Sequence, residues 1–278
     1  MEPNYNSAAD LRAFLDEKGL GMRKKFGQNF LINPAIREAL VRALEAPPGE
    51  SVWEVGPGLG AMTSLLLEQG LSVRAFEIDA GFSRFLKEQF AANVHFTLVE
   101  GDVLKTWQAE SVSPYLLGNL PYNIAAVLLA DLIEKRRFFR RIVVTVQREV
   151  ARRMTALPGS ADYSSFSVLC SSVYYVKPLM VIKGAAFYPR PHVDSQALLL
   201  ELNEDAASRI RPACFYPLIR RLFSSRRKTI KNNLTGFLPA DAAAQALEKS
   251  SLDGGRRAEN LTLDDFQALA KAIEDMGI

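Results

Sequence analysis

A glycine-rich turn near residue 56 has the composition of a ligand-binding loop. The turn, residues 56–60 (GPGLG), lies between the apolar run Val52–Val55 and the helical pattern Thr63–Gln69. Glycine lets the backbone approach a ligand closely, and the start of a helix offers unpaired N–H groups and a positive dipole end. We therefore expect Gly56 and Gly58 to bind a cofactor.

Two acidic residues end or follow the next two predicted strands. Glu77 ends the run Ser72–Glu77, 21 residues after Gly56, where a carboxylate can accept hydrogen bonds from both hydroxyls of a ribose. Asp102 follows the run His95–Glu100, where it can accept from the exocyclic amine of a nucleoside base. Ligands of open α/β sheets bind at such strand ends. The three segments together predict a site for a cofactor that contains a nucleoside.

The glycine turn is compatible with two cofactors. Gly56, Gly58 and Ala61 match the dinucleotide fingerprint with alanine in its last place, so an NAD-dependent oxidoreductase is one interpretation. Pro57, however, removes an N–H group that a pyrophosphate would use. The turn is better suited to S-adenosyl-L-methionine.

The string Asn119-Leu120-Pro121-Tyr122 follows a fourth predicted strand, Tyr115–Leu117, and has groups that could promote methylation of an exocyclic amine. Such amines are poor nucleophiles because the nitrogen lone pair is delocalised into the ring. The Asn119 side-chain oxygen and the Leu120 carbonyl could accept the amino protons and so expose the lone pair, while Tyr122 stacks on the base. The alternative interpretation is a β-turn in which Asn119 caps and Tyr122 packs.

A proline-rich segment, residues 187–195 (FYPRPHVDS), precedes the last predicted strand. Its two prolines favour an extended, rigid loop. Such a loop could hold Phe187 against the second face of a target base. Phe187 could equally be a core aromatic residue, and the residues alone favour neither interpretation.

The elements that would position these residues alternate between strands and helices. Further strand-like runs are Ile142–Val146, Leu179–Ile182 and Ala197–Leu202, and helical patterns cover Gly81–Phe90 and Ala125–Glu134. This alternation predicts an α/β fold: a Rossmann-like, mostly parallel sheet with helices on both faces. The glycine turn suited to S-adenosyl-L-methionine indicates that this is a methyltransferase sheet. Strand-like runs stop after residue 202. We therefore expect a methyltransferase domain at residues 1–202 and a smaller helical, RNA-contacting domain at 203–278.

The overall composition is that of a soluble globular protein. Of 278 residues, 48% are apolar and 23% are charged, which excludes a disordered chain, a collagen-like repeat and a coiled coil. Cys170 and Cys214 fit no disulfide framework, and the two histidines are too few to suggest a metal centre. No apolar stretch approaches the ~20 residues of a membrane helix, and no signal peptide is evident. We expect a cytoplasmic protein, and nothing argues against a monomer.

Basic residues are concentrated in one segment. Residues 206–236 contain eight basic and no acidic residues, and the remaining 26 basic and 31 acidic residues give the rest of the chain a net charge of −5. A basic segment on a mildly acidic body favours a polyanionic partner. Six residues of this segment are predicted to contact the phosphates of such a partner, which the resemblance described below implies is RNA: Arg220, Arg221, Arg226, Arg227, Lys228 and Lys231.

The order of these motifs resembles the ribosomal RNA adenine dimethyltransferase family. The resemblance runs from about residue 24 to residue 234. It rests on seven motifs: FGQNFL at 26–31, EVGPGLGAMT at 54–63, Glu77, Gly101-Asp102, NLPYNI at 119–124, FYPRPHVDS at 187–195 and RRKTIKNNL at 226–234.

The resemblance implies roles that spacing alone does not show. It places Gln28, Asn29 and Leu31 in the cofactor pocket and Phe187 on the target base. It also implies that Gly56, Glu77, Asp102 and Asn119 hold S-adenosyl-L-methionine. The substrate it implies is a pair of adjacent adenines near the end of small-subunit ribosomal RNA, with a role in subunit biogenesis.

Four alternatives remain open at this point. A large-subunit RNA methyltransferase of the resistance type shares most motifs. A DNA adenine methyltransferase and a nicotinamide oxidoreductase are the other enzymatic interpretations. From another class, the protein could act mainly as a ribosome-assembly or RNA-binding factor. The first twenty and last forty residues are assigned no function.

Overall fold

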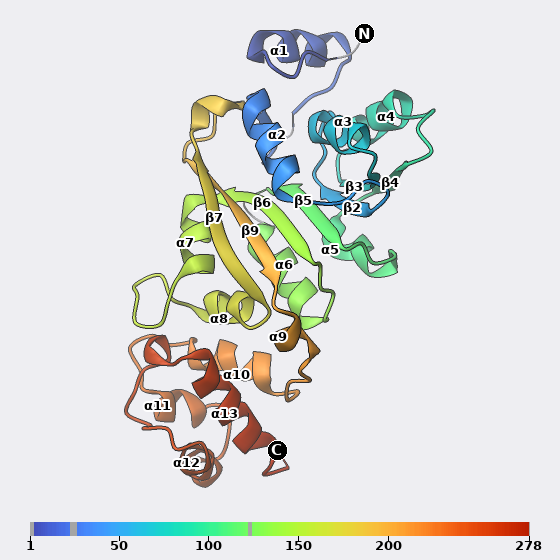
Figure 1. The fold of residues 1–278 in the computed structure, drawn as a ribbon. Coiled ribbons are helices and arrows are strands. Elements are labelled where there is room, and N and C mark those ends of the chain that lie inside the picture. Colours follow the sequence, from blue (N-terminus) through green and yellow to red (C-terminus); the bar gives the residue numbers. More distant parts are fainter. Residues whose placement is uncertain (1–2, 23–26, 122–123, 278) are drawn as a thin grey trace. The chain divides into compact units, whose positions relative to one another are not determined.

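The structure is a computed structural model that describes residues 3–22, 27–121 and 124–277 (Figure 1). The chain divides into two compact units. The first contains residues 1–132, 137–151 and 176–202, and the second contains residues 133–136, 152–175 and 203–278. Residues 133–136 and 152–175, which were expected in the first domain, group by their contacts with the second unit.

The first unit is built on a seven-stranded sheet in the order β4-β3-β2-β5-β6-β9-β7 (Figure 1). The strands are β2 (Ser51–Val55), β3 (Ser72–Glu77), β4 (Phe96–Glu100), β5 (Tyr115–Asn119), β6 (Arg141–Gln147), β7 (Tyr174–Ile182) and β9 (Ser195–Leu202). The neighbours from β4 to β6 pair in parallel, and β9 runs antiparallel to β6. Residues 142–146 of β6 are all buried, as expected for a strand covered on both faces.

The helices along this part of the chain are α2 (Pro34–Ala43), α3 (Ala61–Glu68), α4 (Ala80–Gln89), α5 (Val103–Thr106), α6 (Ala125–Glu134) and α7 (Arg148–Thr155), with 3-10 turns η2 (Trp107–Ala109) and η3 (Gly184–Ala186). Helices α3, α4 and α6 begin within two residues of their predicted positions, whereas α2, α5 and α7 were not predicted. Side chains of Asn33, Asp79 and Asp102 cap α2, α4 and α5. The predicted α/β sheet with helices on both faces is confirmed.

Two features of the first unit were not expected from the sequence. A two-stranded antiparallel pair joins β1 (Phe30–Leu31) to β8 (Phe187–Tyr188), with Leu31 opposite Phe187. Helix α1 (Ala8–Glu17), capped by the Ser7 side chain, packs on a cluster of buried side chains that includes Phe82. Both features lie beside the carboxyl edge of the sheet, where the predicted site residues are.

The second unit is helical and has its own hydrophobic core. Its helices are α8 (Ser165–Ser171), α9 (Glu204–Ser208), α10 (Phe215–Leu222), α11 (Ile230–Leu234), α12 (Ala240–Lys249) and α13 (Leu263–Glu274), with the 3-10 turn η4 (Ala258–Asn260). Phe215, Ile230 and Phe266 are fully buried at its centre. None of the helices described in either unit is long and apolar enough to span a membrane.

Candidate active site

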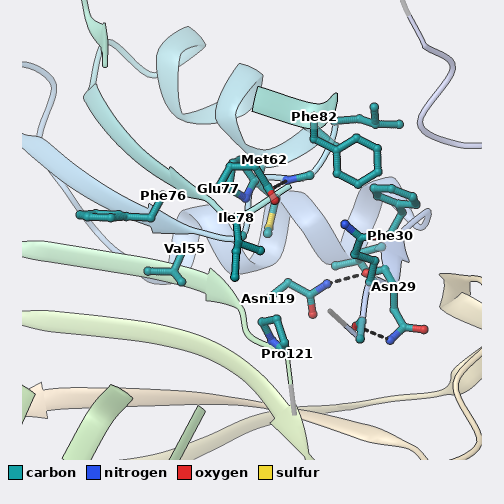
Figure 2. Close-up of a pocket in the computed structure, with 18 of the residues that line it drawn as sticks. Asn29, Phe30, Val55, Met62, Phe76, Glu77, Ile78, Phe82, Asn119 and Pro121 are labelled. Atoms are coloured by element: carbon teal, nitrogen blue, oxygen red, sulfur yellow. Dashed lines mark hydrogen bonds between the residues drawn. The ribbon is translucent and has the colours of Figure 1, made fainter. Parts of the chain in front are cut away.

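A cavity of about 320 Å³ opens in the first unit, at the carboxyl ends of its parallel strands (Figure 2). Its volume is in the range of small-molecule sites. All eight residues predicted to bind the cofactor line it: Gln28, Asn29, Leu31, Gly56, Gly58, Glu77, Asp102 and Asn119. The structure therefore brings together residues from five separate parts of the sequence.

The glycine turn lines the cavity with backbone rather than side chains. Gly56, Gly58 and Gly60 have φ angles of 73°, 59° and 86°, a region that other residues rarely adopt. A Cβ atom on Gly58 would lie 2.9 Å from Cε1 of Phe30. The turn therefore requires glycine for both its conformation and its packing, and its peptide groups border the cavity.

Glu77 is a buried carboxylate that holds this turn in place. Its Oε2 accepts a hydrogen bond from the Gly58 N–H at 3.1 Å, and its Oε1 accepts from the Asp79 N–H at 2.8 Å. The side chain lines the cavity although the residue is only 4% exposed. Burial raises the pKa of Glu77 to about 7. Each oxygen keeps a second lone pair that can accept from a hydroxyl of a bound ligand.

Glu54 is a second buried carboxylate, but it does not line the cavity. Its Oε2 accepts from the Thr63 hydroxyl at 2.6 Å, and Oε1 has no hydrogen-bond partner among the described residues. Burial raises the pKa of this group to about 7 as well. Glu54 and Glu77 are therefore both buried carboxyl groups with a raised pKa, and they differ in that only Glu77 lines the cavity.

Asp102 reaches the cavity from the end of β4. Its Oδ1 caps α5 by accepting from the Leu104 N–H at 3.0 Å. Its other oxygen makes no hydrogen bond with the described residues, so it can accept one from an amine of a bound base.

Asn119 lies at the end of β5 with its amide turned toward residue 29 (Figure 2). Its Nδ2 donates to the backbone carbonyl of Asn29 at 2.8 Å, and the Asn29 Nδ2 donates to the carbonyl of Gly27 at 3.0 Å. This contact assigns the amide orientation, because a carbonyl accepts only from the nitrogen side of the amide. The Asn119 Oδ1 is consequently available as an acceptor at the cavity.

The other three predicted catalytic residues are not found in the lining of the cavity among the residues that the structure describes. Leu120 has a buried side chain outside the cavity lining, and its backbone N–H donates to the Thr145 carbonyl at 3.2 Å. Tyr122 lies outside the described residues. Phe187 is 3% exposed, packs with Leu31 in the core of the first unit and does not line the cavity.

Among the further residues that line the cavity, Tyr5, Leu11 and Arg37 lie outside every motif that the sequence indicated. Nothing in the composition near the N-terminus indicates a site. Arg37 does carry a signal, because it shares the buried face of α2 with Leu40 and Val41. An arginine at a core-facing position has to be paired or functional.

The six basic residues predicted to contact RNA lie in the second unit and differ in how they are engaged. Arg220 pairs with Glu134, Arg221 donates to the Asn233 carbonyl, and Arg226 pairs with Glu259 at 3.1 Å. In contrast, the side chains of Arg227, Lys228 and Lys231 are exposed and make no ion pair or hydrogen bond with the residues that the structure describes. We call Arg227, Lys228 and Lys231 the open basic cluster.

Comparison with known proteins identifies the family. Residues 19–275 match the family model described as ribosomal RNA adenine dimethylase. The chain belongs to this family. It is 46% identical to Ribosomal RNA small subunit methyltransferase A of Treponema denticola, over 98% of this chain and 96% of that protein. It is 39% identical to the protein of the same name from Borreliella afzelii, with the same coverage of 98% and 96%.

Solved structures agree with this assignment. A dimethyladenosine transferase from Plasmodium falciparum has a TM-score of 0.77 at 25% identity and covers 88% of this chain and 98% of its own. The 23S rRNA methyltransferase ErmE has a TM-score of 0.63 at 20% identity, with 88% and 99% covered, and shows the shared fold. The predicted family, enzyme class and S-adenosyl-L-methionine dependence are confirmed.

The residues of the cavity fit this cofactor. The bare backbone at Gly56 and Gly58 leaves room for it, Glu77 can accept from two vicinal hydroxyls, and Asp102 can accept from an adenine amine. These acceptors match the hydroxyls and the base amine of a nucleoside.

Titration of Glu77 should make cofactor binding depend on pH. The protonated acid loses one acceptor and its charge, so the affinity for S-adenosylhomocysteine should fall by roughly tenfold from pH 8 to pH 6. Calorimetry across this range measures it. Glu77→Gln should bind weakly with little pH dependence, whereas Glu54→Gln should retain strong, pH-dependent binding because Glu54 lies outside the cavity lining. A wild-type affinity that is constant over this range would contradict the assignment.

Proposed function

We propose that this protein dimethylates the N6 amines of two adjacent adenines near the end of small-subunit ribosomal RNA, during assembly of the subunit in the cytoplasm. The observation that carries the proposal is the fixed orientation of Asn119, whose Oδ1 is available at the edge of a cofactor-sized cavity. The choice of subunit is supported by relatives up to 46% identical that are named small-subunit methyltransferases.

The chemistry requires positioning more than proton transfer. S-adenosyl-L-methionine supplies an electrophilic methyl group on its sulfonium. The Asn119 Oδ1 and the Leu120 carbonyl accept the two amino protons, which localises the nitrogen lone pair toward that methyl group. The Asn29 carbonyl holds the Asn119 amide in this orientation from behind, at 2.8 Å from Nδ2. No ionised base is needed because the methylated ammonium product is acidic enough to lose a proton to water.

Two aromatic residues complete the proposed base site. Tyr122, in the NLPY string, is proposed to stack on one face of the adenine and Phe187 on the other. Phe187 is buried beside Leu31 in the core of the first unit, so contact with an adenine requires its side chain to move. This movement would couple RNA binding to a rearrangement at β8.

RNA phosphates are proposed to bind the second unit through its basic segment. The open basic cluster is best suited to this, because its charges are not already neutralised by the described carboxylates. Arg220 and Arg226 would have to exchange Glu134 and Glu259 for phosphate, and Arg221 is held beside Gly236 and Asn233.

Substrate choice is tested by methylating purified unmodified subunits in vitro. With labelled S-adenosyl-L-methionine, small-subunit particles should incorporate four methyl groups on two adjacent adenines, located by mass mapping of the RNA. Incorporation only into large-subunit RNA would support the resistance-type alternative, and activity on duplex DNA but not on RNA would overturn the proposal.

Asn119→Ala should reduce methyl transfer by about 10² to 10³, because loss of one directed acceptor typically costs this much. Affinity for S-adenosylhomocysteine should fall only severalfold, since Gly58, Glu77 and Asp102 remain. The matched control is Asn93→Ala, whose side chain accepts from the His95 N–H away from the cavity. Wild-type transfer by Asn119→Ala would refute the mechanism. If subunit assembly continued normally with this variant, the alternative of an assembly factor with incidental catalysis would gain support.

Replacing Arg227, Lys228 and Lys231 by Gln should reduce RNA affinity. The plot of log affinity against log salt concentration should also become less steep, by the amount expected for the loss of about 2 to 3 phosphate contacts. Filter binding from 50 to 300 mM salt measures the slope. Arg12→Gln, Arg42→Gln and Lys271→Gln form the control, because each of these exposed residues lies in an i,i+3 or i,i+4 helix pair. An unchanged slope in the first variant would place the RNA surface elsewhere.

A further inference from the structure

The N-terminal segment, residues 5–17, forms part of the wall of the cofactor cavity. Tyr5 and Leu11 both line the cavity. Helix α1 buries Leu11, Phe14 and Leu15 in a cluster with Leu59 and Phe82, and Phe14 meets Phe85 edge-on at 5.4 Å. The segment is therefore packed directly on the glycine turn and on α4.

Tyr5 links this segment to the glycine turn. Its hydroxyl donates to the Leu59 carbonyl at 2.9 Å. Leu59 lies between Gly58 and Gly60, whose backbone conformation shapes the cavity. A change in the position of Tyr5 would therefore be transmitted to the backbone that borders the cofactor.

Arg37 holds Tyr5 from the opposite side. Its Nη1 donates to the carbonyls of Leu31 at 2.7 Å and Tyr5 at 3.2 Å, and its Nη2 donates to the Asn6 side chain at 2.6 Å. The guanidinium carbon also lies 6.0 Å from the centre of the Tyr5 ring. One side chain of α2 thus connects β1, which carries a cofactor residue, to the N-terminal segment.

The placement of Arg37 is costly for folding. The residue is 6% exposed, and no ion pair to it is found among the described residues. Burial accordingly lowers the pKa of Arg37. A buried charge without a carboxylate partner destabilises a fold unless its hydrogen bonds compensate. Here the compensating bonds go mainly to backbone and to the Asn6 amide, which an apolar residue on α2 would not require.

We propose that Arg37 is a positioning residue for cofactor binding: it clasps the N-terminal segment against β1 and the glycine turn, and so closes one wall of the cavity. The proposal rests on the cofactor site proposed above. The segment is joined to the rest of the unit by the hydrogen bonds of Tyr5 and Arg37 and by one hydrophobic cluster, and in this proposal it moves away when the cofactor is exchanged. The strength of the clasp then sets how long the cofactor and its product stay bound.

The test measures product release and turnover separately. In Arg37→Met, which retains the apolar stem, S-adenosylhomocysteine should dissociate about tenfold faster, and the KM for S-adenosyl-L-methionine should rise by a larger factor than kcat falls. Tyr5→Phe, which removes the hydroxyl that donates to the Leu59 carbonyl, should increase the dissociation rate by about threefold. Arg37→Lys, which keeps a positive charge and hydrogen-bond donors, should release S-adenosylhomocysteine at a rate between those of the wild type and Arg37→Met. Arg42→Met on the exposed face of α2 is the matched control and should match wild type.

Amide hydrogen exchange provides a second readout. Residues 8–17 should exchange more slowly when S-adenosylhomocysteine is added to the wild-type protein, and this protection should be reduced in Arg37→Met. If Arg37→Met does not fold, Tyr5→Phe provides the test. The proposal is overturned if these variants release product at the wild-type rate while Glu77→Ala releases it faster. If Glu77→Ala also shows no change, the cofactor site itself is misplaced, and the proposal fails with it.

Discussion

The hydrogen bond between the Glu77 carboxylate and the Gly58 N–H is the constraint on which the site depends. It fixes a turn whose glycines have left-handed backbone conformations, and it does so from the neighbouring strand β3. Phe30 packs against the same turn so closely that no Cβ atom fits at Gly58. The cavity exists because strand pairing, turn geometry and aromatic packing all agree at this one position. Its acidic edge costs folding free energy, as the raised pKa of Glu77 shows.

Much of the first unit could be predicted because its information is local. Each strand of the parallel sheet is an apolar run, and Gly56, Glu77, Asp102 and Asn119 come at or just after the ends of such runs. Their convergence follows from the rule that parallel strands end at one edge of a sheet. The β1–β8 pair was not predictable in the same way, because two-residue strands have no periodicity. The N-terminal wall was missed for a related reason: its role depends on long-range contacts of Tyr5 and Arg37 rather than on a motif.

The basic segment shows why a count of charges predicts the class of partner but not which basic side chains face that partner. Eight positive charges without an acidic residue correctly describe residues 206–236. Folding then divides them, because carboxylates distant in the sequence, such as Glu134 and Glu259, pair with Arg220 and Arg226. Arg221 serves the local structure by bonding to the Asn233 carbonyl. Which positive charges remain accessible is a property of the tertiary structure of the second unit.

The register of β1 and β8 has a thermodynamic consequence. Leu31, which lines the cofactor cavity, is opposite Phe187, which is proposed to contact the target base. A large shift of either residue would displace the other, because the two are paired across β1 and β8. The proposed sites for the cofactor and the target base therefore meet at this strand pair. Any effect of one ligand on the free energy of binding the other is then equal and reciprocal. In an enzyme that methylates one nitrogen twice, this linkage would let the presence of an adenine influence the exchange of spent for fresh methyl donor.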